Sequence, residues 1–303
     1  MSVAGIIVIH AVVLCMTSMA CPAAYADDKP FTLPEAPLRI FPEHYEYAVD
    51  STFLPRGDLF RPLIADPKEP QFYLSYRVFK FSSEQIHSAV GGYGGVFGLY
   101  RHVGDSNGYD WQVSFSGGIH AQFDLHSPSL DLVNTDYTFG FPVTLRNGPA
   151  SYRLLLYHQS SHLGDEFLLH NHIQRVELSY EALQLIRSYE RQTWRTYYGG
   201  EYIVHQGPTD LKPAAIQGGV EFTGSDTIVG RGTLVGGCDL KSDQQHDWSL
   251  DTSIKIGLQF ASSDSNGRAI RVLAEGYKGF NSYGQFYIER IMYVGLGIYL
   301  ILD

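Results

Sequence analysis

From residue 71 onward, apolar and polar residues alternate along the chain over long runs. In segment 109–116, Tyr, Trp, Val and Phe alternate with Asp, Gln, Ser and Ser, and segment 248–260 repeats the pattern. A period of two predicts β-strands with one apolar and one polar face. About twelve such segments begin near residues 71, 89, 109, 135, 151, 172, 193, 214, 231, 248, 268 and 288.

These segments predict an all-β fold, a transmembrane antiparallel β-barrel of about 12 strands over residues 71–303. The strands are long, turn signals separate them, and aromatic residues cluster near their ends, as in barrels with an apolar lipid face and a polar lumen. The alternative is a secreted β-sandwich. Charged residues such as Arg77, Arg153 and Lys255 at inward positions favour the barrel. Residues 181–192 are interpreted differently, as a short helix in a periplasmic turn.

The N-terminal residues predict export. An apolar run over residues 3–20 leads to Ala24-Tyr25-Ala26, which is typical of a signal peptide spanning residues 1–26, although no Lys or Arg precedes the run. A lipoprotein signal ending at Cys21 is the alternative. Residues 27–70 hold most of the remaining prolines and predict an irregular periplasmic extension that packs on the barrel or leads into it. We therefore expect a bacterial outer-membrane protein whose partners are the barrel assembly machinery and outer-membrane lipids or lipopolysaccharide.

Composition narrows the classes of function. A formal net charge of −10 and a pI near 5.6 exclude a typical nucleic-acid-binding protein, which carries a basic face. The mean hydropathy of −0.11 argues against a bundle of transmembrane helices. Cleavage after Ala26 would leave Cys238 as the single cysteine, so no disulfide framework is expected.

Segment 157–172 is the one stretch that could carry chemistry. If Arg153 and Gln159 point inward, His158 and Ser160 lie on the lipid-facing side of the same strand. A polar pair on that face costs free energy unless it is paired or lies near the headgroups. An imidazole two residues from a hydroxyl on one strand face can also accept the hydroxyl proton.

The His-x-Ser pair resembles that of the outer-membrane phospholipase A and lipid A deacylase barrels. The resemblance implies a serine-type lipid acyl hydrolase with His158 as general base and Ser160 as nucleophile. In those families an orienting residue follows the serine by about twelve positions. Here that position is His172 instead of asparagine or glutamate, and Asn171 or Glu177 is the alternative. The competing interpretation of the pair is an interface pair that bonds to headgroups or neighbouring strands.

The residues after Ser160 suggest a divalent-cation site. Carboxylate oxygens from Asp165 and Glu166 would suit Ca²⁺, and the His162 imidazole would suit Zn²⁺ or a similar metal. The alternative is a polar solvated loop. No nucleotide or redox cofactor is expected, because no glycine-rich phosphate loop lies between a strand and a helix.

Three phrases resemble a bacterial family known as domain of unknown function 1207. They are residues 62–70 (PLIADPKEP), 158–166 (HQSSHLGDE) and 283–287 (YGQFY). The resemblance implies an exported barrel but no activity. Two hypotheses therefore remain: a barrel that hydrolyses lipid acyl esters, and a non-enzymatic channel or structural surface protein.

Overall fold

The computed structural model describes residues 51–81, 84–104, 108–171, 173–207, 210–229, 232–261 and 268–302. The predicted signal peptide and the extension up to residue 50 lie outside the described residues. No described helix is long and apolar enough to cross a membrane. The elements are β1 Thr52–Phe53, β2 Phe72–Phe81, β3 Glu84–His102, β4 Asp110–Asp124, β5 Leu132–Asn147, β6 Ala150–Leu163, α2 Asp165–Asn171, β7 Ser179–Arg191, β8 Trp194–Gly207, β9 Ala214–Val229, β10 Gly232–Asp243, β11 Leu250–Ala261, β12 Ala269–Phe280, the 3₁₀ turn η1 Gly284–Phe286 and β13 Arg290–Ile301.

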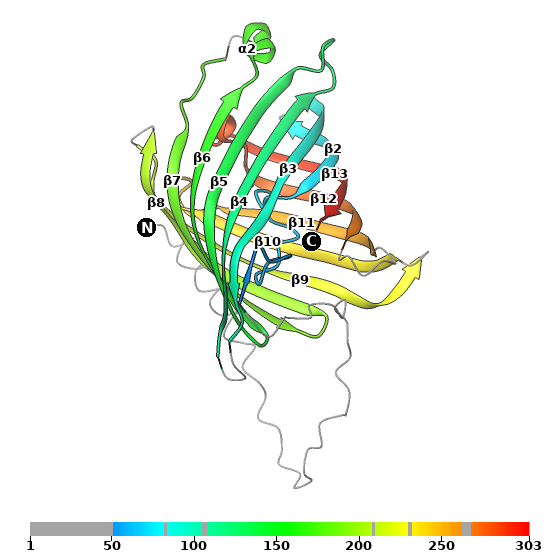
Figure 1. The fold of residues 1–303 in the computed structure, drawn as a ribbon. Coiled ribbons are helices and arrows are strands. Elements are labelled where there is room, and N and C mark those ends of the chain that lie inside the picture. The colour runs from blue at the N-terminus through cyan, green and yellow to red at the C-terminus, as the bar shows by residue number, and fades with distance from the viewer. Residues whose placement is uncertain are drawn as a thin grey trace, which may run out of the picture. The chain divides into compact units, whose positions relative to one another are not determined.

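Strands β2 to β13 form a closed antiparallel barrel of twelve strands, which confirms the predicted fold (Figure 1). Each strand pairs with its neighbours in sequence, and β13 pairs with β2 to close the sheet. Closure gives each of these strands a hydrogen-bonded neighbour on both sides and leaves no free sheet edge, which a strand wall needs in lipid. The loops after β4, β6, β8, β10 and β12 therefore share one end of the barrel, called here the α2 end.

Strand β7 corrects the helix expected over residues 181–192. In β7 the inward side chains of Ala182, Ile186 and Ser188 are buried, whereas Leu183 and Leu185 point outward and are exposed. Apolar residues lie on both faces of this strand, so apolar and polar residues do not alternate clearly along its sequence. The strand also begins seven residues later than the expected start near 172.

The two faces of the wall differ as the alternation predicts. Outward positions carry exposed apolar side chains, whereas many inward positions carry buried polar and charged ones. Arg77 pairs with Glu275 at 2.8 Å, and Arg195 pairs with Glu221 at 3.0 Å, and all four side chains are almost completely buried. The charges of these four side chains are thus neutralised by partners, as buried charges generally are.

An irregular segment, residues 54–71, lies inside the lumen and is called here the luminal segment. Leu63 and Ala65 are completely buried. The backbone N–H of Ile64 donates to Glu221 Oε1 at 2.6 Å. The Phe60 ring contacts the guanidinium groups of Arg153 and Arg195, each 4.7 Å from its centroid. The described part of the proline-rich stretch, residues 51–70, is irregular except for β1, which pairs with β3, and it both packs on the barrel wall and leads into β2.

The loop between β12 and β13 folds into the lumen from the α2 end. The Gly284 backbone N–H donates to Asp136 Oδ2 at 3.1 Å, and Gln285 Nε2 donates to the carbonyl oxygen of Ser161 at 2.7 Å. Lys68 of the luminal segment forms an ion pair with the same Asp136 carboxylate. The three segments of residues 62–70, 158–166 and 283–287 therefore come together around Asp136.

Candidate functional site on the outward face of β6

His158 and Ser160 lie on the outward face of β6, as the alternation predicts. Arg153 and Gln159 are buried on the inward face, whereas the outward Leu154 and Leu156 are exposed. Ser160 lies three residues before the end of β6 at Leu163, so the pair lies toward the α2 end of the strand. The pair is thus at the edge of an apolar outward surface.

Glu181 on β7 binds His158 directly. The two residues are register partners, and Glu181 Oε1 lies 2.8 Å from His158 Nδ1. On the other side of β6, the ring of the β5 residue Phe139 lies 5.3 Å from the imidazole ring. The carboxylate fixes the ring by its Nδ1 atom, which leaves Nε2 as the nitrogen available to accept a proton.

His205 on β8 extends this arrangement to a third strand. Its Nδ1 atom lies 2.6 Å from Glu181 Oε2, so the carboxylate uses one oxygen for each imidazole. The exposed fraction rises along the row, from 25% for the His158 side chain to 38% for Glu181 and 82% for His205. An imidazole–carboxylate–imidazole row therefore crosses the outward face.

Ser160 is the next outward residue after His158 toward the α2 end. Two residues of a strand span roughly 7 Å. Its register partners are Tyr137 on β5 and Ser179 on β7. Among the described residues, no hydrogen bond to the Ser160 hydroxyl is formed. Rotation of the two side chains would be needed to bring Oγ to His158, and such bonds often tighten only with substrate.

The orienting residue expected at His172 lies outside the described residues. Of the alternatives, Asn171 donates its amide to the Phe167 carbonyl oxygen at 3.0 Å, and Glu177 is exposed in the loop before β7. Neither binds His158 in the described structure. Glu181 was missed because its segment was interpreted as a helix, and only the pairing of β6 with β7 places its carboxylate beside the imidazole.

The three residues expected to bind a cation do not form a cluster. Asp165 and Glu166 lie exposed in the first turn of α2, and His162 Nδ1 lies 3.0 Å from Arg175 Nη2. Within the described parts of the chain, no group of three or more His, Cys, Asp or Glu side chains is placed to hold a metal ion.

The neighbouring His170 binds Asp131 at the same end of the barrel. Its Nδ1 atom lies 2.7 Å from Asp131 Oδ2, while the Ser129 hydroxyl donates to Oδ1 at 2.6 Å. The Ser129 and His170 hydrogen bonds hold the pKa of the Asp131 carboxyl below its usual range. This histidine therefore ties α2 to the loop before β5.

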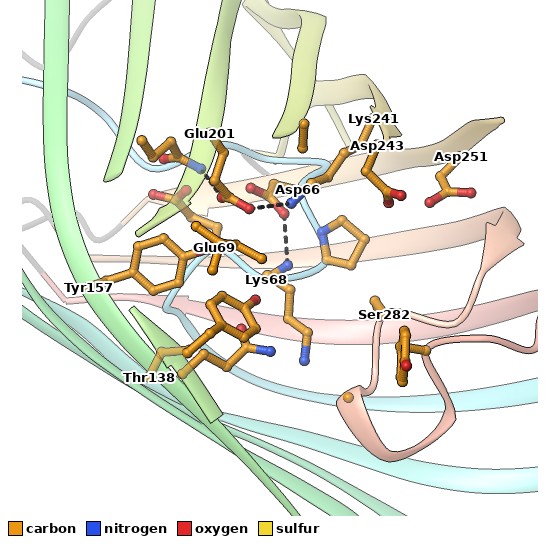
Figure 2. A pocket seen from close by; sticks show the side chains of 18 of the residues that line it. Asp66, Lys68, Glu69, Thr138, Tyr157, Glu201, Lys241, Asp243, Asp251 and Ser282 are labelled. Atoms are coloured by element: carbon orange, nitrogen blue, oxygen red, sulfur yellow. Dashed lines mark hydrogen bonds and ion pairs between the residues drawn. The ribbon is translucent and has the colours of Figure 1, made fainter. Parts of the chain in front are cut away.

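A separate cavity of about 220 Å³ lies within the lumen beside the luminal segment (Figure 2). Asp66, Lys68 and Glu69 line one side of it. Glu201 and Lys241, 3.4 Å apart, line another. Tyr157 lines it from β6, one residue before His158, so the cavity and the outward pair lie on opposite faces of the same strand.

Residues 2–301 match the model of a family described as a protein of unknown function, DUF1207. The chain belongs to this family. The match includes the three segments 62–70, 158–166 and 283–287. No curated protein matches the chain.

The DUF1207 barrel is similar in fold to solved structures of outer-membrane proteins. The outer membrane phospholipase A from Escherichia coli is 13% identical, with 80% of this chain and 94% of that chain covered and a TM-score of 0.54. The Salmonella typhi outer membrane phospholipase dimer with bound calcium is also 13% identical, with 82% and 94% covered and a TM-score of 0.52. At this identity the likeness shows the fold. The DUF1207 chain has an outer-membrane-type β-barrel fold.

Proposed function

We propose that the chain is an outer-membrane lipid acyl-ester hydrolase whose site is the outward-facing group of Ser160, His158 and Glu181. The observation that carries the proposal is the 2.8 Å contact between His158 Nδ1 and Glu181 on the lipid-facing side, beside a serine on the same strand face. This is the arrangement in which a carboxylate orients an imidazole toward a hydroxyl.

The position on the wall supports the proposal. Polar and ionisable groups on a lipid-facing surface cost free energy, and where they occur they usually have a function. The strand below His158 presents Leu154 and Leu156 outward, a surface along which acyl chains can pack. With an N-terminal extension on the periplasmic side, the α2 end faces the exterior, and the group meets lipid of the outer leaflet.

In the proposed reaction, Ser160 Oγ attacks the ester carbonyl carbon while His158 Nε2 accepts the hydroxyl proton. Glu181 holds the ring and stabilises the imidazolium. Collapse of the tetrahedral intermediate breaks the ester C–O bond, and His158 returns the proton to the leaving alcohol. Water then releases the fatty acid from the acyl-serine by the same route. Backbone amides of the adjoining loop or a bound Ca²⁺ would stabilise the oxyanion.

The rival function is a non-enzymatic channel or structural surface protein. The luminal segment and the loop between β12 and β13 occupy the lumen and are held by buried ion pairs and hydrogen bonds. This packing weighs against an open channel. Planar-bilayer recordings of the wild type should therefore show no stable porin-like conductance step.

The test is acyl-chain release from micelles of mixed phospholipid and lipopolysaccharide, with Ca²⁺ and then with EDTA. Wild type is compared with Ser160→Ala and with the matched control Ser179→Ala, which removes the exposed register partner of Ser160 on β7. Release by wild type and Ser179→Ala but not by Ser160→Ala would support the assignment. Release that survives Ser160→Ala would exclude Ser160 as the nucleophile, and no release from any variant would favour the structural role. A loss of release with EDTA alone would show that a cation is required.

A further inference from the structure

A histidine and an arginine lie directly beyond Ser160 at the α2 end. His162 is the next outward residue of β6, and Arg175 Nη2 lies 3.0 Å from its Nδ1 atom. The ring of Tyr137, the β5 register partner of Ser160, meets the His162 ring edge-on at 5.7 Å. Tyr137 is 44% exposed, as expected of an aromatic residue at a membrane interface. The His162–Arg175 pair is therefore on the headgroup side of the proposed nucleophile.

The Arg175 side chain lies in different surroundings from those of the arginines in the lumen. Arg77, Arg153 and Arg195 each form a buried ion pair with a carboxylate. Arg175 is exposed, and among the described residues no carboxylate lies within ion-pair distance of it. The acidic residues of its own loop and of α2 form no ion pair with it either. A guanidinium with open donors beside an imidazole is a good partner for a phosphate group.

The spacing fits one class of lipid. Ser160 and His162 are two residues apart on one face, roughly 7 Å along the strand. The ester carbonyl and the phosphate of a glycerophospholipid are separated by only a few covalent bonds. With acyl chains along Leu154 and Leu156 and the ester at Ser160, the phosphate reaches the His162–Arg175 pair. We infer that His162 and Arg175 form a subsite for the phosphate of a lipid whose ester lies at Ser160.

This inference rests on the proposed function, because it places the ester at Ser160. It gives His162 a role other than the metal ligand expected from the sequence. It also assigns the substrate class as a phosphate-bearing lipid rather than a neutral glyceride. Since phosphate binding does not require turnover, the subsite can be tested in a variant that lacks the nucleophile.

The test measures binding of dioctanoyl phosphatidic acid and of dioctanoylglycerol to the full-length protein in neutral-detergent micelles, by native mass spectrometry. All proteins carry Ser160→Ala. The Ser160→Ala protein is compared with three proteins that carry one further substitution each: Arg175→Gln, His162→Gln or, as the matched control, Arg187→Gln. Arg187 is an exposed arginine on β7 whose Nη1 atom bonds the Tyr198 hydroxyl at 2.9 Å, farther along the strand from the α2 end. Inorganic phosphate at the same concentration is added as a competitor.

The expected result is preferential binding of phosphatidic acid that weakens by about tenfold or more in Arg175→Gln and less in His162→Gln, since charge-assisted hydrogen bonds are the stronger ones. Dioctanoylglycerol binding and the Arg187→Gln control should not change. Equal weakening in Arg187→Gln, or no preference for phosphatidic acid, would overturn the subsite. Equal competition by inorganic phosphate would also overturn it, because it would indicate an ion site without lipid recognition. If wild type releases no fatty acid while Arg175 still governs phosphatidic acid binding, the hydrolase proposal fails and the subsite stands.

Discussion

Glu69 and Arg153 form a bidentate ion pair in the lumen, with Arg153 Nη1 and Nη2 at 2.7 and 3.1 Å from the two carboxylate oxygens of Glu69. The pair joins the luminal segment to β6, the strand whose other face carries His158 and Ser160. Both side chains are almost completely buried, at 2% and 6% exposed. The inward face of β6 thus holds the luminal segment while its outward face holds the candidate site.

Breaking this pair should destabilise the barrel strongly. Glu69→Ala leaves the Arg153 guanidinium buried without its carboxylate, which costs about 3–5 kcal/mol. Urea unfolding in detergent micelles measures the change in the free energy of unfolding. The control is Lys212→Ala, which removes a pair with Asp247 in which the side chains are 45% and 90% exposed, and should cost at most about 1 kcal/mol. Equal effects of the two substitutions would show that the buried pair does not anchor the segment.

The glycine of the η1 turn should not tolerate a side chain. A Cβ at Gly284 would lie 2.5 Å from Leu178 Cδ2 and 2.7 Å from Ser161 Cβ. We expect Gly284→Ala to displace the loop between β12 and β13 and to cost about 1–3 kcal/mol. Gly276→Ala in β12 is the control, because its Cβ would meet nothing within 4 Å. Limited proteolysis of the loop should be faster in Gly284→Ala only.

Phe60, the one aromatic residue of the luminal segment, should contribute strongly to the stability of the barrel. Truncation in Phe60→Ala removes a ring that is 1% exposed and leaves a cavity beside two guanidinium groups, so we expect a loss of about 3–5 kcal/mol in the free energy of unfolding. Phe53→Ala removes an aromatic side chain that is 79% exposed and should change it much less. The thermal midpoint of the gel-mobility shift would compare them, and similar midpoints would contradict the packing described here.

Glu181 should matter for hydrolysis more than the residues near position 172. Glu181→Ala removes the group that orients His158, so acyl release should fall roughly 100-fold or more. Glu181→Gln keeps a hydrogen-bonding partner and should retain more activity than Glu181→Ala. Glu177→Ala and Asn171→Ala, whose side chains do not contact His158, should leave the rate near that of wild type. A rate that depends on Glu177 instead would reassign the orienting residue.

The alternation of residues predicted which side chains point outward, because it depends only on the geometry of a single strand. It placed His158 and Ser160 outward and Arg153 and Gln159 inward, as the structure has them. It could not predict contacts between strands, since the Glu181 carboxylate reaches His158 across a separation of 23 residues set by register. Contacts inside the lumen were still harder to predict from the sequence. Glu69 and Arg153 are 84 residues apart, and the residues around either one give no sign that the two form an ion pair.

The luminal segment is tethered at both ends to one strand. Before it, β1 pairs with β3 at Thr52 and Phe53, and after it β2 pairs with the same strand. The chain thus leaves the wall, crosses the interior and re-enters the wall at Phe72, beside the seam between β13 and β2. Because the segment that fills the interior continues directly into a strand of that seam, we expect closure of the barrel and packing of its interior to be coupled during assembly.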